Sequence, residues 1–210
     1  MEKKFILTDK FVINSFGIKL FQIKCTKSFK YAQKGDFGGY VEKEGNLDQE
    51  NDAWVFDNAR VFGNARVSSN ARVSGDAWVS DNARVSGDAW VSDNAWVSSN
   101  ALVSGDALVF GNARVSGDAW VSGNAWVSGD ADIENDNEHC GFDGFGSCNR
   151  HTHAYMTKEK KVEIICGCFR GSIEEFEKKV EETHSGTVYE KQYKSIINVI
   201  KIKFGLTDFT

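Results

Sequence analysis

The chain has 210 residues, of which 41% are hydrophobic and 12% aromatic, and its formal net charge is −5. This composition predicts one or two globular domains, and the mild negative charge argues against electrostatic capture of nucleic acid. We expect no membrane span or signal peptide because no apolar run is long enough, and the odd number of cysteines, five, favours a reducing cytosol over a disulfide framework.

Residues 1–40 predict a hairpin that covers the start of the repeats that follow. The segments from Phe5 to Ile13 and from Ile18 to Cys25 alternate apolar and polar side chains, and turn residues at 14–17 separate them. An uncovered edge of a parallel sheet would pair with other strands. We therefore expect the hairpin to act as a cap.

A six-residue repeat fills the chain from Asp52 to Ile133. Each repeat has Asn or Asp, Ala, a variable residue and Val, then Ser or Phe and a small turn residue, and valine recurs at every sixth position from Val55 to Val127. Ala and Val stand two residues apart, as on the inner face of a short strand. The other positions favour turns or tolerate a positive φ. Such a period predicts a stack of identical units.

Each repeat is therefore interpreted as one strand and one corner, so that three repeats close a triangular coil of eighteen residues. Successive coils pair their strands in parallel at a spacing of about 4.8 Å. Val41 and Leu47 supply an earlier turn, and two extra residues before Val55 predict a bulge at one corner. The sequence thus predicts a mainly β fold, a parallel β-helix of about five coils over residues 41–134.

The repeat resembles the hexapeptide repeat of left-handed parallel β-helix proteins. The lead-in from Lys34 to Leu47, the repeats and the segment from Gly167 to Gly171 are similar to hexapeptide-repeat proteins commonly encoded by bacteriophages and prophages. This resemblance implies a left-handed prism, a trimer as in the superfamily, and the cytoplasm of a bacterial host. The period alone permits either hand, and the general preference for right-handed crossovers points the other way.

The variable residue between Ala and Val points outward, and all six tryptophans occupy this position. A tube lined by small and branched residues has no room for an indole, so we expect every indole outside it. Two interpretations are open for the outward residues: contacts between neighbouring coils, or burial against another molecule. The most apolar face is the candidate interaction face, and it consists of Trp54, Phe56, Arg72, Trp90, Leu108, Phe110 and Trp126.

The sequence favours a binding protein over an enzyme, and we expect no cofactor. Many hexapeptide-repeat proteins are acyltransferases with a histidine near the prism and an extruded loop, but these repeats contain neither a histidine nor an insertion. A transferase would need a neighbouring subunit to supply His139 or His151 to the prism. We expect non-catalytic binding or scaffolding, with a homo-oligomer, a host protein or a small nucleotide as partner, and interference with a host defence factor as one instance. A hexapeptide-type acyltransferase and a structural virion or assembly component are the alternatives.

Residues 135–150 lose the period and are rich in Gly and Asn, which predicts an ordered linker. Four possible zinc ligands lie in and after this segment: Cys140, Cys148, His151 and His153. The gap between the two cysteines is wider than in most structural zinc sites. We therefore expect no metal and treat these four residues as zinc candidates only.

Residues 151–210 predict a small ββαα module, with strands at 151–157 and 161–168 and two helices after them. Ser172 and Glu175 have the spacing of a capping box at the start of the first helix. Arg170, Gly171 and Ser172 precede that helix, where backbone amides could hold an anion. Many helices begin in this way with nothing bound.

Overall fold

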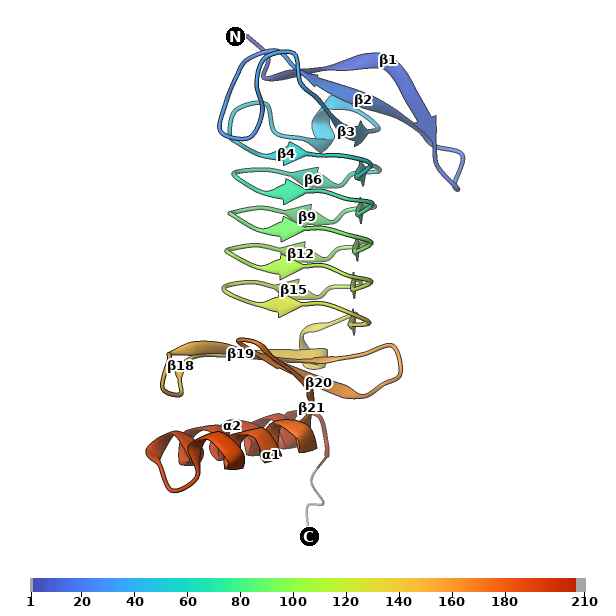
Figure 1. The fold of residues 1–210 in the computed structure, drawn as a ribbon. Coiled ribbons are helices and arrows are strands. Elements are labelled where there is room, and N and C mark those ends of the chain that lie inside the picture. The colour runs from blue at the N-terminus through green and yellow to red at the C-terminus, as the bar shows by residue number, and fades with distance from the viewer. Residues whose placement is uncertain (1, 207–210) are drawn as a thin grey trace.

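The computed structural model describes residues 2–206, which form three parts stacked along one axis (Figure 1). An antiparallel hairpin lies at one end, a parallel β-solenoid forms the middle, and a small sheet with two helices lies at the other end. The predicted fold class is confirmed. No helix in the described part of the chain is long and apolar enough to cross a membrane.

Each repeat forms one strand of two residues, the outward residue followed by the inward valine or isoleucine. These strands are β4 (Trp54–Val55), β5 (Arg60–Val61), β6 (Arg66–Val67), β7 (Arg72–Val73), β8 (Trp78–Val79), β9 (Arg84–Val85), β10 (Trp90–Val91), β11 (Trp96–Val97), β12 (Leu102–Val103), β13 (Leu108–Val109), β14 (Arg114–Val115), β15 (Trp120–Val121), β16 (Trp126–Val127) and β17 (Asp132–Ile133).

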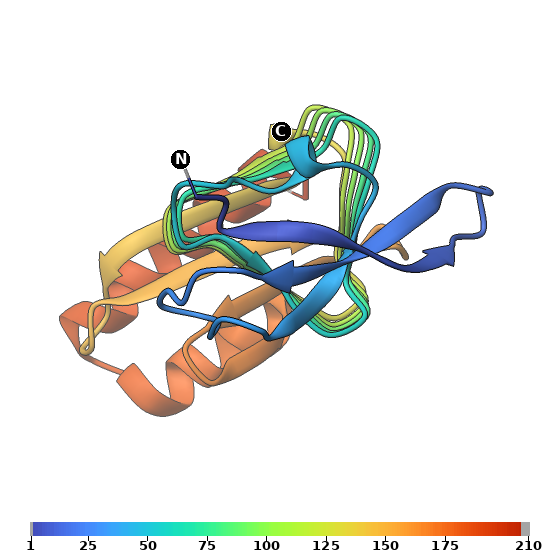
Figure 2. The same ribbon diagram turned by 90° about the horizontal axis from the view of Figure 1, so that it is seen from above.

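The strands form three faces of the solenoid. The first face is the sheet β4-β7-β10-β13-β16, the second contains β5-β8-β11-β14-β17, and the third is β6-β9-β12-β15. Viewed along the axis, the coils superimpose (Figure 2). Partner residues are 18 apart, as for Trp90 and Leu108, but Val41 pairs with Val61, 20 residues on. This offset confirms the two extra residues of the first coil. The hand of the winding stays a prediction.

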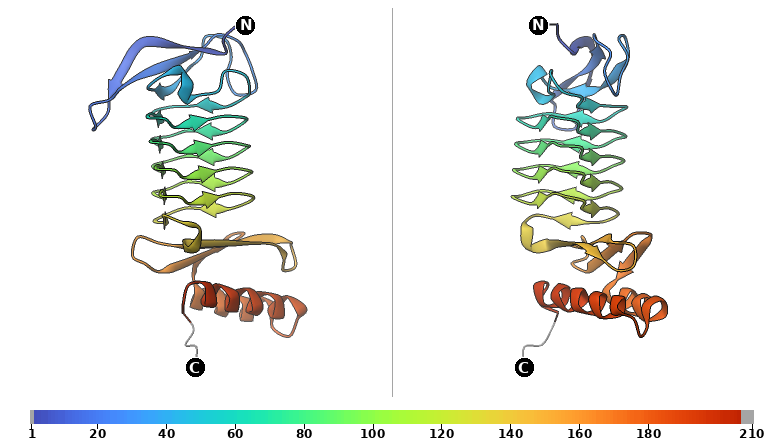
Figure 3. Two further views of the ribbon diagram at one scale, coloured as in Figure 1. Left: turned by 180° about the vertical axis from the view of Figure 1, so that it is seen from behind. Right: turned by 90° about the vertical axis from the view of Figure 1, so that its left-hand side faces the viewer.

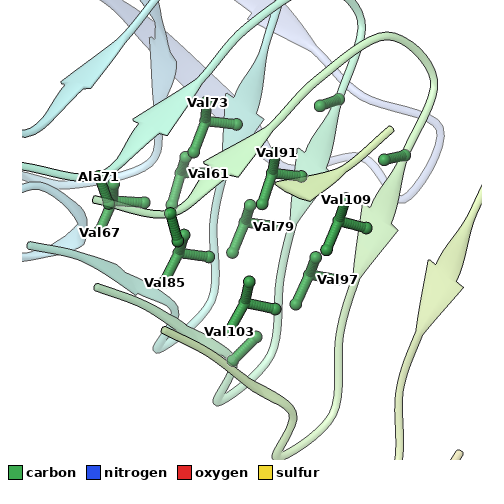
Figure 4. Packing of buried hydrophobic residues seen from close by; sticks show 14 of the residues in the cluster. Val61, Val67, Ala71, Val73, Val79, Val85, Val91, Val97, Val103 and Val109 are labelled. Carbon is green, nitrogen blue, oxygen red and sulfur yellow. The ribbon is translucent and has the colours of Figure 1, made fainter. Parts of the chain in front are cut away.

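The interior of the solenoid consists of the repeat alanines and valines. These residues, from Ala53 to Ile133, are at most 3% exposed. Their side chains stack in columns from coil to coil (Figure 4). Apolar burial along a continuous column is the main stabilising term for such a stack, because each coil contacts only its neighbours.

The corners join neighbouring coils by side-chain hydrogen bonds. Asn64 donates to Asn82, Asn82 to Asn100 and Asn100 to Asp118, each one coil further along. The Asp81 carboxylate accepts from the backbone N–H of Ser99 at 3.1 Å and so stabilises the corner one coil further along. At each corner, the residue that follows Ser or Phe adopts a positive φ and is Gly, Asp or Ser.

The cap consists of β1 (Phe5–Ile13) and β2 (Lys19–Cys25), which pair antiparallel as predicted and extend the second face through β3 (Phe37–Val41). A 3-10 helix, Glu44–Asn46, follows. The buried Lys4 ammonium donates to the carbonyl oxygens of Asn51 and Ala53, at 2.5 and 2.9 Å, and fixes the cap to the first coil.

The sequence predicts every indole outside the tube, and Trp54 occupies the outward position of β4, but it is only 1% exposed. Its ring lies outside the tube, but Phe5 and Phe29 of the N-terminal segment cover it, with ring centroids at 6.3 and 5.3 Å. The cap therefore buries one end of the first face.

The C-terminal module contains a four-stranded antiparallel sheet rather than two strands. Its strands are β18 (His139–Phe145), β19 (Arg150–Met156), β20 (Val162–Cys166) and β21 (Phe169–Ser172), and its helices are α1 (Ile173–His184) and α2 (Val188–Lys203). The prediction that residues 135–150 are a linker is therefore wrong: after a 3-10 helix, Asp136–Glu138, this segment contains β18, which pairs with β19. The capping box of Ser172 and Glu175 is confirmed.

The sheet lies between the last coil of the solenoid and the two helices (Figure 3). Because side chains alternate across a strand, successive residues contact different layers. Tyr155 and Ile165 pack with the solenoid core, whereas Ala154, Ile164 and Cys166 pack with the helices. The module thus closes the solenoid end with one face of its sheet.

Candidate functional site

The open part of the first face is a groove lined by aromatic and aliphatic side chains. Trp90, Leu108, Phe110 and Trp126 line it, from β10, β13 and β16 and the corner after β13, and its volume is about 450 Å³. We call these four residues the aromatic groove. They are brought together because the repeat places every eighteenth residue in one column.

The rings of the aromatic groove are held in place by neighbours. The Trp90 indole N–H donates to Ser74 Oγ at 2.8 Å, and the Arg72 guanidinium stacks 4.5 Å from the Trp90 ring centroid. Phe110 contacts Trp126 edge to face at 6.2 Å. Trp90 and Trp126 are each 38% exposed, so fixed apolar surface faces solvent.

The rim of the aromatic groove is acidic. Asp57 and Asp93 line it, and each carboxylate accepts a hydrogen bond from a backbone N–H of the next coil, at 3.2 and 3.1 Å. Since these hydrogen bonds fix the carboxylates, the groove combines an apolar floor with negative charge at its edge.

The other residues of the predicted interaction face lie next to the cap and contact it. Trp54 is buried, and Phe56 packs against Tyr31, with ring centroids at 6.4 Å. Arg72 lies between the two parts, because its guanidinium stacks on both Tyr31 and Trp90. The structure therefore separates the seven predicted residues into a covered part and the open groove.

The second face shows the contacts between coils that the other interpretation predicts. Trp78 and Trp96 are neighbours at 5.9 Å, and Arg60 and Arg114 stack on them. Phe16 of the hairpin also contacts Trp78. Trp120, on the third face, is the most exposed of the six indoles, at 54%.

Three histidines lie where the solenoid meets the sheet. His153 is buried, its Nδ1 is 2.8 Å from the main-chain oxygen of Trp126, and its Nε2 is 3.1 Å from His139 Nδ1. A carbonyl oxygen only accepts, so His153 Nδ1 carries the proton and Nε2 accepts from His139. Burial lowers the pKa of His153 to about 3 and also lowers the pKa of His139.

The histidines thus reach the prism within a single chain, which sequence reasoning missed. The available signal was the two-residue spacing of His151 and His153, which places both on one face of a strand. His151 Nδ1 lies 2.8 Å from Asp143 Oδ1, and Asn124 of the last coil donates to the same oxygen at 3.2 Å. The hydrogen bond from His151 lowers the pKa of the Asp143 carboxyl.

The four zinc candidates do not converge. His151 and His153 lie on the solenoid side of the sheet, whereas Cys140 packs with the helices and Cys148 is exposed in the turn before β19. Burial raises the pKa of Cys140 to about 11, which disfavours the thiolate that a metal needs. Within residues 2–206, no group of three or more His, Cys, Asp or Glu is placed to hold a metal ion.

The donors of the predicted anion site are used within the chain. Arg170 forms an ion pair with Glu163, with Nε 2.8 Å from Oε1. Ser172 Oγ accepts from the backbone N–H of Glu175 and donates to the Glu174 carboxylate. Gly171 pairs within the sheet as part of β21. The helix N-terminus is thus occupied by the chain's own carboxylates.

The repeats are similar to a known family of solenoids. A family model described as the YdcK beta solenoid repeat matches residues 65–81, 77–93, 83–99 and 107–123. The first and third ranges begin 18 residues apart, which is the length of one coil in the structure. No curated protein sequence matches the chain. The chain is a β-solenoid repeat protein, and its central repeats are similar to those of YdcK.

Proposed function

We propose that this chain is a non-catalytic binding scaffold and that the aromatic groove binds another copy of the chain. The observation that carries the proposal is the fixed, solvent-facing surface of Trp90 and Trp126 in one concave site. Trp is enriched among the residues that dominate binding energy, and contiguous exposed apolar surface usually marks an interaction site.

The rigidity of the groove supports binding. The Trp90 ring is already fixed by Ser74 and Arg72, so a partner would not have to order it. Binding to a preorganised surface avoids part of the side-chain entropy cost. Further copies bring identical apolar faces, and three copies arranged around one axis would cover these faces against one another. The resemblance to hexapeptide-repeat proteins favours a trimer.

The test is sedimentation velocity at micromolar concentration, with Trp90→Glu and a matched control. Trp120 is the control because it has the same position in the repeat, and its indole N–H also donates to a serine sixteen residues earlier, at 3.3 Å. We expect the wild type and Trp120→Glu to sediment as trimers and Trp90→Glu as a monomer. A monomeric wild type, or equal behaviour of the two variants, would refute the proposal.

We further propose that the chain belongs to a bacteriophage or prophage and acts in the cytoplasm of a bacterial host, on a host protein or a small host nucleotide. The segments from Lys34 to Leu47 and from Gly167 to Gly171, which resemble phage-encoded proteins, support this. The test is a pulldown from bacterial lysate with Trp90→Glu as the comparison, analysed for proteins and small molecules. A partner retained equally by the wild type and by Trp90→Glu would not be bound through the aromatic groove.

A hexapeptide-type acyltransferase is the second candidate. It is favoured by the hydrogen-bonded pair of Asp143 and His151, which resembles the arrangement of an oriented general base. An acyl-CoA assay with the wild type and with His151→Gln decides between the two. Turnover that His151→Gln abolishes would favour the transferase, and its absence across acyl donors would favour the scaffold.

A further inference from the structure

A second hollow lies between the solenoid and the C-terminal sheet. Its volume is about 230 Å³, and it is lined by Asn124, Trp126, Arg150, His151, Ile165 and Gly167. We call it the junction cavity. The first two residues belong to the last coil and the other four to β19, β20 and the turn after β20. The cavity therefore exists only because the module docks on the solenoid.

We propose that the junction cavity binds a small planar aromatic anion, such as an aromatic carboxylate or a nucleoside monophosphate. This inference rests on the proposed binding role of the chain. The charged residue of the junction cavity comes from the C-terminal sheet and not from the aromatic groove. Ligand binding in the cavity and assembly through the groove can therefore each fail without the other.

The apolar part of the cavity suits a flat ring. Trp126 supplies an indole that Phe110 holds edge to face, and Ile165 supplies a buried aliphatic side chain from the sheet. The volume is about half that of the aromatic groove and is enough for one ring system. Aromatic rings stack on indoles in an offset or edge-to-face arrangement.

The charged part of the cavity is Arg150, which is exposed. Its guanidinium lies over Gly167 so closely that a Cβ at that glycine would be 2.5 Å from Nη1. Among residues 2–206, no carboxylate forms an ion pair with Arg150, whereas Arg170 in the same sheet is paired with Glu163. An unpaired guanidinium beside an apolar slot is suited to bidentate binding of a carboxylate or phosphate.

The third wall of the junction cavity is formed by His151 and Asn124, and it is fixed before any ligand binds. His151 and Asn124 both hydrogen-bond to Asp143, which ties the sheet to the last coil. Gly141 lies against the His151 ring, and a Cβ there would be 2.7 Å from Cε1. The imidazole is therefore held by a carboxylate on one side and by backbone on the other. A ring entering the cavity meets three walls that are already in place.

The test is isothermal titration of the full chain with adenosine 5′-monophosphate and with 1-naphthoate, alongside adenosine and inorganic phosphate as incomplete ligands. Titrations use the wild type and Trp90→Glu, because assembly through the aromatic groove would also cover Trp126. We expect at least one complete probe to bind with a Kd below about 1 mM, and the incomplete ligands to bind at least about tenfold more weakly. Binding of only one complete probe would identify the source of the anion.

Two variants locate the binding. Arg150→Met should weaken binding by about tenfold or more, because it removes charge-assisted hydrogen bonds. Arg84→Met is the control, since Arg84 is an exposed arginine on the third face, away from the cavity, and should change nothing. Both arginines are exposed, so we expect both variants to fold. Unfolding midpoints equal to that of the wild type will show that they do. The proposal is overturned if neither complete probe binds, if adenosine or phosphate binds as tightly, or if the two variants behave alike.

Discussion

The imidazole of His153 donates from Nδ1 to the main-chain oxygen of Trp126 over 2.8 Å, and this hydrogen bond joins the C-terminal sheet to the last solenoid coil. His153 Nε2 accepts from His139, so the neutral ring uses both nitrogens. The contact makes the module a closing layer on the solenoid rather than an appended domain. It also places a titratable group at the one junction on which the cavity depends.

Acid should weaken this junction. Burial lowers the pKa of His153 from 6.5 to about 3, and His139 and His151 lie beside it. Below pH 6.5 His153 is protonated in the unfolded chain, but in the folded chain it stays neutral down to about pH 3. The free energy of unfolding therefore falls as the pH falls between these values, by up to about 1.4 kcal/mol per pH unit.

The measurement is chemical unfolding of the wild type and of His153→Gln between pH 7 and pH 4. We expect a shallower decrease in the free energy of unfolding for His153→Gln, because glutamine does not titrate. Parallel curves for the two proteins would show that His153 is not the source of the acid sensitivity.

Corner glycines stack directly on one another along the solenoid. Gly87 has a φ of +70°, and a Cβ there would be 2.8 Å from the backbone nitrogen of Gly105 one coil away. Gly123, two coils further along, has a φ of +63°, but a methyl group added there would meet no atom within 4 Å. Gly123→Ala should therefore cost about 1–2 kcal/mol, from the left-handed backbone alone.

Gly87→Ala should cost more, because the same backbone strain is joined by a clash with main-chain atoms that cannot rotate away. The difference in the free energy of unfolding between the two variants, measured by denaturant titration, isolates that clash. Equal losses would show that the coils separate at this corner without cost.

Trp54 should behave as a core residue and Trp120 as a surface residue, although they have the same position in the repeat. Trp54→Ala should destabilise the protein by about 3–5 kcal/mol, because it leaves a cavity beneath Phe5 and Phe29. Trp120→Ala should cost about 1 kcal/mol or less, since its indole is 54% exposed. Thermal unfolding of Trp54→Ala and Trp120→Ala is the measurement. Similar unfolding midpoints for the two variants would contradict burial of Trp54 by the cap.

The solenoid was predictable because its information is local. Ala and Val recur at a fixed spacing, and each repeat forms the same strand and corner, so no long-range pairing had to be guessed. The offset of 20 residues between Val41 and Val61 followed from counting the residues between repeats.

The ends were less predictable because their contacts span the chain. Nothing near Trp54 in the sequence shows that Phe5 will cover it. Strand β18 was missed because its Gly-rich sequence has low strand propensity and depends on pairing with β19. The site was predicted in part: periodicity gave the column of Trp90, Leu108 and Trp126, but the junction cavity depends on docking.

Hydroxyl-radical footprinting of the indoles, read residue by residue by mass spectrometry at a concentration where the protein is assembled, tests the central claim most directly. Trp90 and Trp126 are each 38% exposed, Trp120 is 54% exposed and Trp54 is 1% exposed. If copies associate through the aromatic groove, Trp90 and Trp126 will be protected nearly as well as Trp54, while Trp120 is oxidised. Oxidation of Trp90 and Trp126 in proportion to their exposure would contradict the claim.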